Sequence, residues 1–244
     1  MNFPLNTFKT DEDLRAGVVF ILDKPLEWTS FDVVNKIRFA IRNKLKVKKF
    51  KVGHAGTLDP LATGVLIICV GKMTKQIEGF MGEAKEYTGT IKLGATTPSY
   101  DLETEVDEEF PIDHITPEKM EEARLNFIGE QEQRPPIFSA KKVGGMTAYK
   151  AARKGLPIEL KMAHIRIDEF EYTKVDLPEV DFRLACSKGT YVRSVAYDLG
   201  QKLDSGGHLT ALRRIRSGDF TIDDALKVEE IVEMVNGCEI VGEV

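Results

Sequence analysis

Short apolar segments recur along this chain and are separated by segments of helical period. Residues 17–22 and 65–70 are continuous apolar runs with glycine beside them, and each is typical of a buried strand. Residues 87–93 and 180–186 instead alternate apolar and polar positions, which is the pattern of a strand with one buried face. The hydrophobic pattern therefore predicts several strands spread over the whole length.

Helical spacing of apolar residues predicts helices between these strands. Thr29 or Ser30 can cap one helix, and Thr116 followed by Pro117 opens another. Thr221 can cap a last helix, and residues 192–203 carry an apolar stripe of helical period. Strands and helices alternate irregularly, so we expect an α+β fold with a mixed, largely antiparallel sheet flanked by helices. No repeat or linker is visible, which favours one domain over residues 1–244.

The overall charge argues against a nucleic-acid-binding protein, but its distribution does not. The chain has 244 residues, 42% of them hydrophobic, and a formal net charge of −5. Residues 36–51 hold eight Lys or Arg and no acid, whereas residues 101–109 hold six acids and no base. An acidic mean can therefore coexist with a basic face that binds phosphates, although a charge run is more often a solvated surface.

The cysteines and the N-terminus indicate a cytoplasmic protein. The three cysteines lie far apart and form no C-x-x-C pair, as expected of reduced thiols. Residues 1–15 lack the apolar region of a secretory signal, and the apolar run 65–70 is too short to span a membrane.

A glycine-rich segment, residues 53–64 (GHAGTLDPLATG), carries the candidate chemistry. It has neither helical nor strand period and is expected to be a structured loop. Its three glycines permit positive φ, and Pro60 disfavours helical backbone at Asp59. A carboxylate held in this way can act as nucleophile or base, although on the loop alone an Asp that only stabilises a turn is the more ordinary interpretation. Phosphate-loop, dinucleotide and zinc-ligand patterns are missing from the sequence, so no cofactor or metal is predicted.

Six segments of the chain resemble, in order, the TruB-type pseudouridine synthases. The loop with the strand after it is similar to the family's catalytic G-x-LDP-x-A-x-G stretch. The segments are residues 17–25, 53–71, 85–87, 135–149, 186–200 and 208–214. The resemblance implies the pseudouridine synthase catalytic fold. It also implies a tRNA substrate, with no redox cofactor because substrate and product are isomers.

The same resemblance implies roles for individual residues. Asp59 would be the catalytic carboxylate, Arg193 would pair with it, and Tyr87 would stack on the target base. The expected substrate-binding residues are Leu212 as an apolar wall against the uracil ring, His54 near the phosphate or the flipped nucleotide, and Lys24 as a support from the first strand. Asp101 is a candidate to orient Arg193.

Each residue also has an ordinary structural interpretation that the sequence alone leaves open. Tyr87 and Leu212 are compatible with core positions, and Arg193 is compatible with a surface ion pair. His54 can simply satisfy local backbone groups.

The resemblance implies that the protein isomerises uridine to pseudouridine in the T arm of tRNA, at position 55, after flipping the base out of the RNA. Asp59 would add to C1′ of the ribose or remove a proton from C2′.

Basic residues expected to hold phosphates are residues 36–51, Lys141, Lys142, residues 150–154, Arg213, Arg214 and Arg216. No protein partner and no separate C-terminal RNA-binding domain are expected. The alternatives are a non-catalytic tRNA-binding module on the same fold and a hydrolase that uses two carboxylates.

Overall fold

The computed structural model describes residues 3–139, 141–143, 145–148, 151, 154, 156 and 160–241. The chain forms two compact units: unit 1 is Met1–Lys85 with Arg213–Val244, and unit 2 is Glu86–Leu212. Strands β4 (Lys85–Leu93) and β12 (Gly207–Ser217) contain residues of both units. The single-domain organisation expected from the sequence stays a prediction.

The sheet of unit 1 is built around one long apolar strand. β3 (Ala62–Val70) pairs antiparallel with β1 (Val18–Lys24) and also with β2 (Val52–Ala55). The strand order continues from β3 to β12, and β13 (Phe220–Thr221) pairs with the end of β12. From residue 65 to residue 70, β3 is entirely apolar and buried, because both faces of this sheet are covered.

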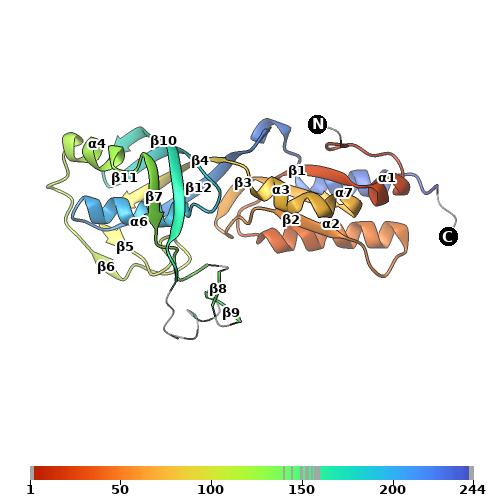
Figure 1. The fold of residues 1–244 in the computed structure, drawn as a ribbon, viewed down its shortest axis with the longest axis horizontal. Helices are drawn as coiled ribbons and strands as arrows, with labels where there is room; N and C mark the ends of the chain where they lie inside the picture. The colour runs from red at the N-terminus through yellow and green to blue at the C-terminus, as the bar shows by residue number, and fades with distance from the viewer. Residues whose placement is uncertain are drawn as a thin grey trace. The chain divides into compact units, whose positions relative to one another are not determined.

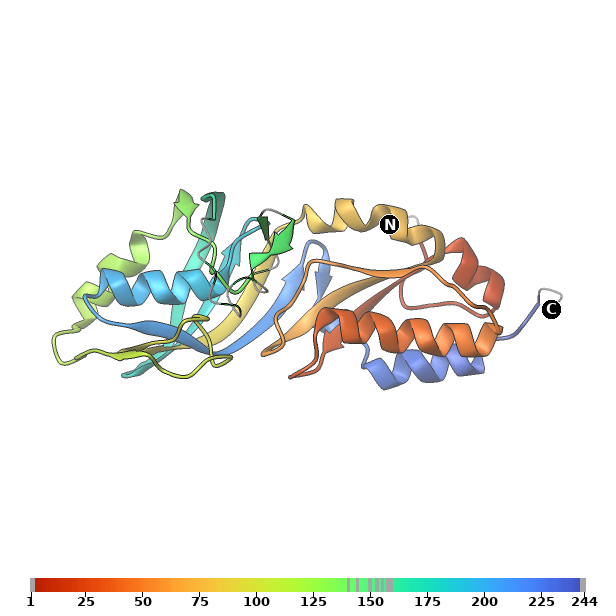
Figure 2. The ribbon, with the colours of Figure 1, turned by 90° about the horizontal axis from the view of Figure 1, so that it is seen from below.

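Helices cover the two faces of the unit 1 sheet (Figures 1 and 2). One face packs against η1 (Gly71–Gln76) and α3 (Ile77–Met81), through a buried cluster of Val19, Ile21, Ala55, Val65, Ile67, Cys69 and Phe220. On the opposite face α2 (Ser30–Leu45) and α7 (Val228–Gly237) lie side by side, as Figure 2 shows. The short helix α1 (Asp11–Ala16) contacts η1.

Local sequence explains where α2 begins and which face it buries. Thr29 and Asp32 form a reciprocal capping box that satisfies backbone groups at the helix start. The buried face carries Val33, Val34, Ile37, Ala40 and Ile41, which confirms the predicted helical period. The helix ends at Lys46, whose φ of 53° is left-handed.

Unit 2 contains the strand order β12-β4-β11-β10-β7, with β11 (Glu179–Cys186), β10 (Ala163–Asp176) and β7 (Gly129–Gln133). β10 pairs antiparallel with both β11 and β7. Helices α4 (Pro117–Leu125) and α6 (Val192–Lys202) contact each other, and Thr116 caps α4 as predicted. Two small hairpins complete the unit: β5 (Ala95–Thr96) with β6 (Glu108–Glu109), and β8 (Lys142–Val143) with β9 (Met146–Thr147).

The α+β class with a largely antiparallel sheet is confirmed, and two local predictions are wrong. The glycine-rich segment is a loop only in its middle, because residues 53–55 belong to β2, which pairs with β3, and residues 62–64 are the first residues of β3. Thr221 caps only the short η2 (Ile222–Asp224), because Ala225 returns to extended backbone. The last helix therefore begins at Val228. Across the described residues there is no helix long and apolar enough to cross a membrane.

Candidate active site

Asp59 lies in the turn that connects β2 to β3. The amide of Ala62 donates to the carbonyl of Asp59 at 3.1 Å, which closes the turn just before β3. The side chain of Asp59 is half-buried, whereas Leu58 beside it is fully packed into unit 1. The carboxylate therefore sits at the boundary of the core, on backbone that β3 fixes on one side.

Anchors from α2 and β1 hold the residues on both sides of Asp59. The buried hydroxyl of Ser30 accepts from the amide of Leu58 at 2.9 Å and donates to its carbonyl at 3.0 Å. The carbonyl of Pro60 accepts from the amide of Glu27 at 2.9 Å and from Nζ of Lys24 at 3.2 Å. The turn is thus held in place before any substrate arrives, as a catalytic group requires.

Lys24 is the last residue of β1, and none of its surface is exposed. Besides Pro60, its Nζ donates to the carbonyls of Pro25 at 2.8 Å and Trp28 at 2.5 Å. Burial lowers the pKa of Lys24 to about 8, while the charge of Asp59 acts in the opposite direction. The structure therefore gives Lys24 a clear local function, which is to tie the end of β1 to the turn that carries Asp59.

Arg214 holds the first half of the same turn from inside unit 1. Its side chain is 1% exposed, and its Nε donates to the carbonyl of Val65 at 2.7 Å while Nη2 donates to that of Gly56 at 3.0 Å. The expectation that Arg214 holds a phosphate is wrong, because this guanidinium is enclosed and bonded to protein backbone. Its neighbour Arg213 pairs instead with Asp23, at 2.7 Å and 3.0 Å.

His54 lies on β2 opposite Ile68 and is half-buried. Its Nδ1 is buried and makes no hydrogen bond within the described part of the chain. Burial, followed by the charge of Arg214, lowers the pKa of His54, so the ring is neutral at pH 7. A neutral ring with an unsatisfied nitrogen does not support the alternative that His54 merely satisfies local backbone groups.

Arg193 is buried in unit 2, at the start of α6. Its Nη1 donates to the carbonyl of Ser99 at 3.0 Å and its Nη2 to that of Phe138 at 2.9 Å. Its Nε lies 3.6 Å from a carboxylate oxygen of Asp101, and both side chains are less than 10% exposed. The predicted contact with Asp101 is confirmed, and the alternative of a surface ion pair is wrong.

The other two predicted residues of unit 2 lie on its strands. Tyr87 is on β4 and is only 8% exposed, and Leu212 is on β12 and half-buried. Both positions fit apolar walls as well as core packing. Asp59, His54 and Lys24 belong to unit 1, whereas Tyr87, Arg193 and Leu212 belong to unit 2. Whether these two groups of residues act together stays a prediction.

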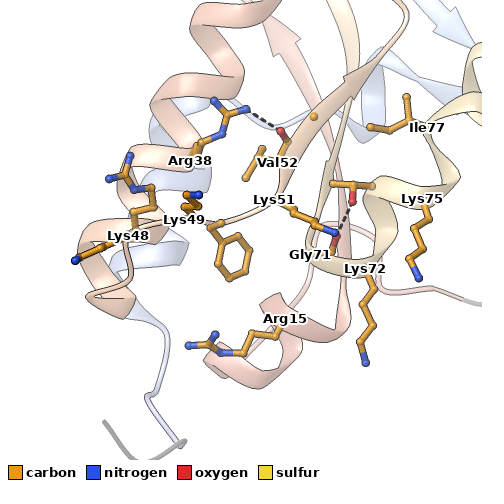
Figure 3. A pocket seen from close by; sticks show the side chains of 14 residues that line it. Arg15, Arg38, Lys48, Lys49, Lys51, Val52, Gly71, Lys72, Lys75 and Ile77 are labelled. Atoms are coloured by element: carbon orange, nitrogen blue, oxygen red, sulfur yellow. Dashed lines mark hydrogen bonds between the residues drawn. The ribbon is translucent and has the colours of Figure 1, made fainter.

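A basic pocket of about 940 Å³ opens on unit 1 beside β2 (Figure 3). Eight of its fourteen lining residues are Lys or Arg and none is acidic: Arg15, Arg38, Arg42, Lys48, Lys49, Lys51, Lys72 and Lys75. Arg38 is fixed by a 2.9 Å bond from its Nη2 to the carbonyl of Val52, which Figure 3 draws. Five of the eight cations come from the basic run 36–51, so much of that run lines one concave surface.

Comparison with known proteins decides the family. The family described as TruB family pseudouridylate synthase (N terminal domain) matches residues 42–192, and the tRNA pseudouridylate synthase B C-terminal domain matches residues 193–239. The chain is 57% identical to tRNA pseudouridine synthase B of Phocaeicola vulgatus over 93% of its own length and 97% of that protein. It is 54% identical to the protein of the same name from Flavobacterium johnsoniae, over 90% and 96% of the two chains. This chain belongs to the TruB family of pseudouridylate synthases.

Solved structures agree with the fold of this TruB-family chain. A chain of an archaeal box H/ACA sRNP matches with a TM-score of 0.63 and 26% identity, over 90% of this chain. A chain of an H/ACA RNP bound to a substrate RNA matches with the same TM-score and identity. This chain spans only 54% and 53% of the lengths of those two. The predicted pseudouridine synthase fold is confirmed.

Two structural anchors of this TruB-family site were not predicted as such from the sequence. The sequence suggests Ser30 only as a helix cap and Arg214 only as a phosphate-binding cation. Glycine spacing and charge do not reveal these roles, because each depends on a tertiary contact. Of the other basic residues expected to hold phosphates, Lys150, Arg153 and the side chain of Lys142 lie outside the described part of the chain.

Proposed function

We propose that this chain converts the uridine at position 55, in the T arm of tRNA, to pseudouridine, with Asp59 as the catalytic carboxylate. The observation that carries the proposal is the turn held from Gly56 to Ala62, which fixes an acid at the edge of the core. The relatives named tRNA pseudouridine synthase B support the same reaction on tRNA.

The reaction needs no group outside the chain. The C1′–N1 bond of the uridine breaks, the detached base turns, and C1′ bonds to C5, which loses its proton while N1 gains one. Asp59 in its ionised form attacks C1′ or removes a proton from C2′. The positive charge of Lys24 and the negative charge of Asp59 attract each other. A nearby cation of this kind favours the ionised form of a carboxylate.

The remaining predicted residues act on the base and the RNA in this proposal. Tyr87 stacks on the base, and Leu212 provides an apolar wall while the base turns. Arg193 stabilises the negative charge of Asp59, as a permanently charged guanidinium can. Neutral His54 lies near the phosphate or the flipped nucleotide. Flipping the uridine out of the RNA costs a few kcal/mol, which contacts to phosphates must offset.

The basic pocket is suited to those phosphate contacts. Its lysines and arginines lie beside Gly53, the first residue of the glycine-rich segment and the neighbour of His54. RNA recognition by shape and backbone charge fits such a surface better than reading of base sequence in a helical groove. We also propose that the protein works on tRNA in the cytoplasm without a protein partner. Its three cysteines are all buried as thiols, as is usual in that compartment.

The deciding experiment measures tritium release from tRNA labelled at C5 of uridine. The unaltered protein should release tritium from position 55, and Asp59→Asn should reduce the rate by ~10²–10⁴-fold or more while tRNA binding persists. Asp219→Asn, which alters an acid at the surface of unit 1, is the matched control and should remain active.

The two alternatives predict different products. A non-catalytic tRNA-binding module would bind tRNA but release no tritium from any tRNA, even without substitution. A carboxylate-dependent hydrolase would produce free uracil instead of a joined isomer. Either result would overturn the proposal.

A further inference from the structure

The turn formed by residues 97–101 contacts the guanidinium of Arg193 in unit 2. The amide of Tyr100 donates to the carbonyl of Thr97 at 3.1 Å and closes the turn. Within the turn, the carbonyl of Asp101 accepts from the hydroxyls of Thr97 at 2.7 Å and Ser99 at 3.1 Å. The turn then presents the carbonyl of Ser99 to Arg193 as a hydrogen-bond acceptor, and the carboxylate of Asp101 as an ion-pair partner 3.6 Å from Nε.

Tyr100 occupies a backbone conformation that its side chain disfavours. Its φ is 65°, in the left-handed region where glycine and asparagine are common and bulky residues are rare. Such a residue persists only where the surrounding structure fixes it, and strained residues of this kind cluster at functional sites. The residue that follows it is Asp101, so the direction of that carboxylate depends on the strained conformation.

Two contacts fix Tyr100 from outside the turn. Its ring stacks on Tyr197, with 4.1 Å between ring centroids and 20° between the planes. Its carbonyl accepts from the amide of Leu209 at 3.0 Å. Tyr197 follows Arg193 by four residues on α6, so both side chains project from the same face of the helix. The helix therefore contacts the turn twice, once through the guanidinium and once through the ring stack.

We propose that the Tyr100–Tyr197 stack is a positioning element, which holds residues 97–101 so that Ser99 and Asp101 orient Arg193. The proposal rests on the proposed function, because it assumes that Arg193 assists the isomerisation. Both rings are half-buried, so the stack lies at the margin of the core and not within it. A ring pair that served packing alone would not need a strained residue next to the carboxylate.

The test compares tritium-release kinetics of Tyr197→Ala and Tyr197→Phe, each in the full chain with tRNA labelled at C5. Tyr197→Ala should lower kcat by about tenfold or more with KM unchanged. A displaced catalytic group can lower the reaction rate by up to about 100-fold. Tyr197→Phe keeps the stacked ring and should retain the kcat of the unaltered protein. Adding Tyr100→Ala to Tyr197→Ala should cause little further loss, because the two rings form one contact.

The matched control is Tyr172→Ala, which also removes a half-buried tyrosine of unit 2. Tyr172 packs against Phe170, and its hydroxyl donates to the carbonyl of Met120 at 3.2 Å. This variant should lower the melting temperature but not the kcat of folded protein. Equal kcat in Tyr197→Ala and the unaltered protein, or equal losses in Tyr197→Ala and Tyr172→Ala, would overturn the inference. Loss of tritium release in the unaltered protein would overturn the proposed function instead.

Discussion

Lys24 is a buried cation that donates all three of its hydrogen bonds to backbone carbonyls. Lys24→Met fills similar space but leaves the carbonyls of Pro25, Trp28 and Pro60 without this donor. The carbonyl of Pro60 keeps the amide of Glu27 as a donor. An unsatisfied acceptor costs about 1–3 kcal/mol, and Pro25 and Trp28 lose this donor, so we expect a clearly lower melting temperature. Because the carbonyl of Pro60 follows Asp59 in the turn, kcat should fall as well.

Thermal unfolding and tritium release, measured on the same preparation, check this prediction for Lys24. Lys92→Met, at an exposed position of β4, is the control and should change neither quantity by much. A variant at position 24 with unaltered stability and kcat would show that the anchor is dispensable.

The partly buried carboxyl of Asp198 makes the thermal stability of the protein depend on pH. Burial raises the pKa of Asp198 to about 6, although Lys202 and Arg134 act in the opposite direction. An acid whose pKa is higher in the folded state destabilises the fold above that pKa, and the penalty disappears below the unfolded pKa of about 3.9. Asp198→Asn should therefore raise the melting temperature at pH 8 and lose this advantage as pH falls from 6 toward 4. Melting curves at several pH values test the sign, and an advantage that grows on acidification would contradict it.

Single residues differed in how far the sequence could predict them. Asp59 could be located because glycines and a proline around an acid restrict the backbone in a recognisable way. The contact between Asp101 and Arg193 followed only from family resemblance. Arg213 and Arg214 look alike in sequence, yet one pairs with Asp23 near the surface and the other is enclosed. Only the strand pairing of β12 determines which of the two faces the interior.

At the level of elements, β3 depends on a glycine that allows close backbone approach. Gly64 has a φ of 100°, and a Cβ added to it would lie 2.1 Å from the carbonyl oxygen of Arg214. Gly64→Ala should therefore destabilise the fold by about 3 kcal/mol or more, since overpacking and left-handed backbone both oppose it. Chemical denaturation measures the change in free energy of unfolding.

Gly79 provides the matched control for Gly64, because it lies in α3 and a Cβ added there would meet no described atom within 4 Å. Gly79→Ala should stabilise the fold by about 0.5–1 kcal/mol, the usual helix preference of alanine over glycine. Equal effects of the two substitutions would show that the approach of Arg214 does not constrain β3.

Elements with a strong apolar period were predictable, and elements defined by a partner were not. The apolar stripe and the Thr29 cap located α2 correctly, since both signals lie within the helix itself. Val52–Ala55 shows no period of its own, and its backbone becomes a strand only through pairing with β3. Thr221 does cap a helical turn, but Ala225 breaks the backbone before α7.

At the scale of the whole molecule, the distribution of charge along the sequence indicated a basic surface, and the net charge did not. The chain carries a formal charge of −5, yet eight cations and no acid line one pocket of unit 1. The collinear motifs predicted the α+β class and the family. They did not predict the division into two units, because chain order does not reveal that β4 and β12 contain residues of both.

The basic pocket is the proposed tRNA-binding surface of unit 1. Lys48 and Lys49 line it and belong to the part of the basic run 36–51 that follows α2. If they bind phosphates, Lys48→Gln with Lys49→Gln should weaken tRNA binding. It should also lower the slope of log Kd against log salt by about one for each phosphate interaction that is removed. Because neither residue lies in the turn that carries Asp59, kcat at saturating tRNA should be unchanged.

Filter binding at several salt concentrations separates this electrostatic effect from misfolding. Lys119→Gln with Lys174→Gln removes the same charge from unit 2 at positions outside the pocket, and should leave the slope nearly as it was. A general loss of charge would change both double variants equally, because long-range attraction depends on net charge. An effect confined to Lys48 and Lys49 therefore requires local phosphate binding, and equal slopes in the two variants would exclude this pocket as the tRNA-binding surface.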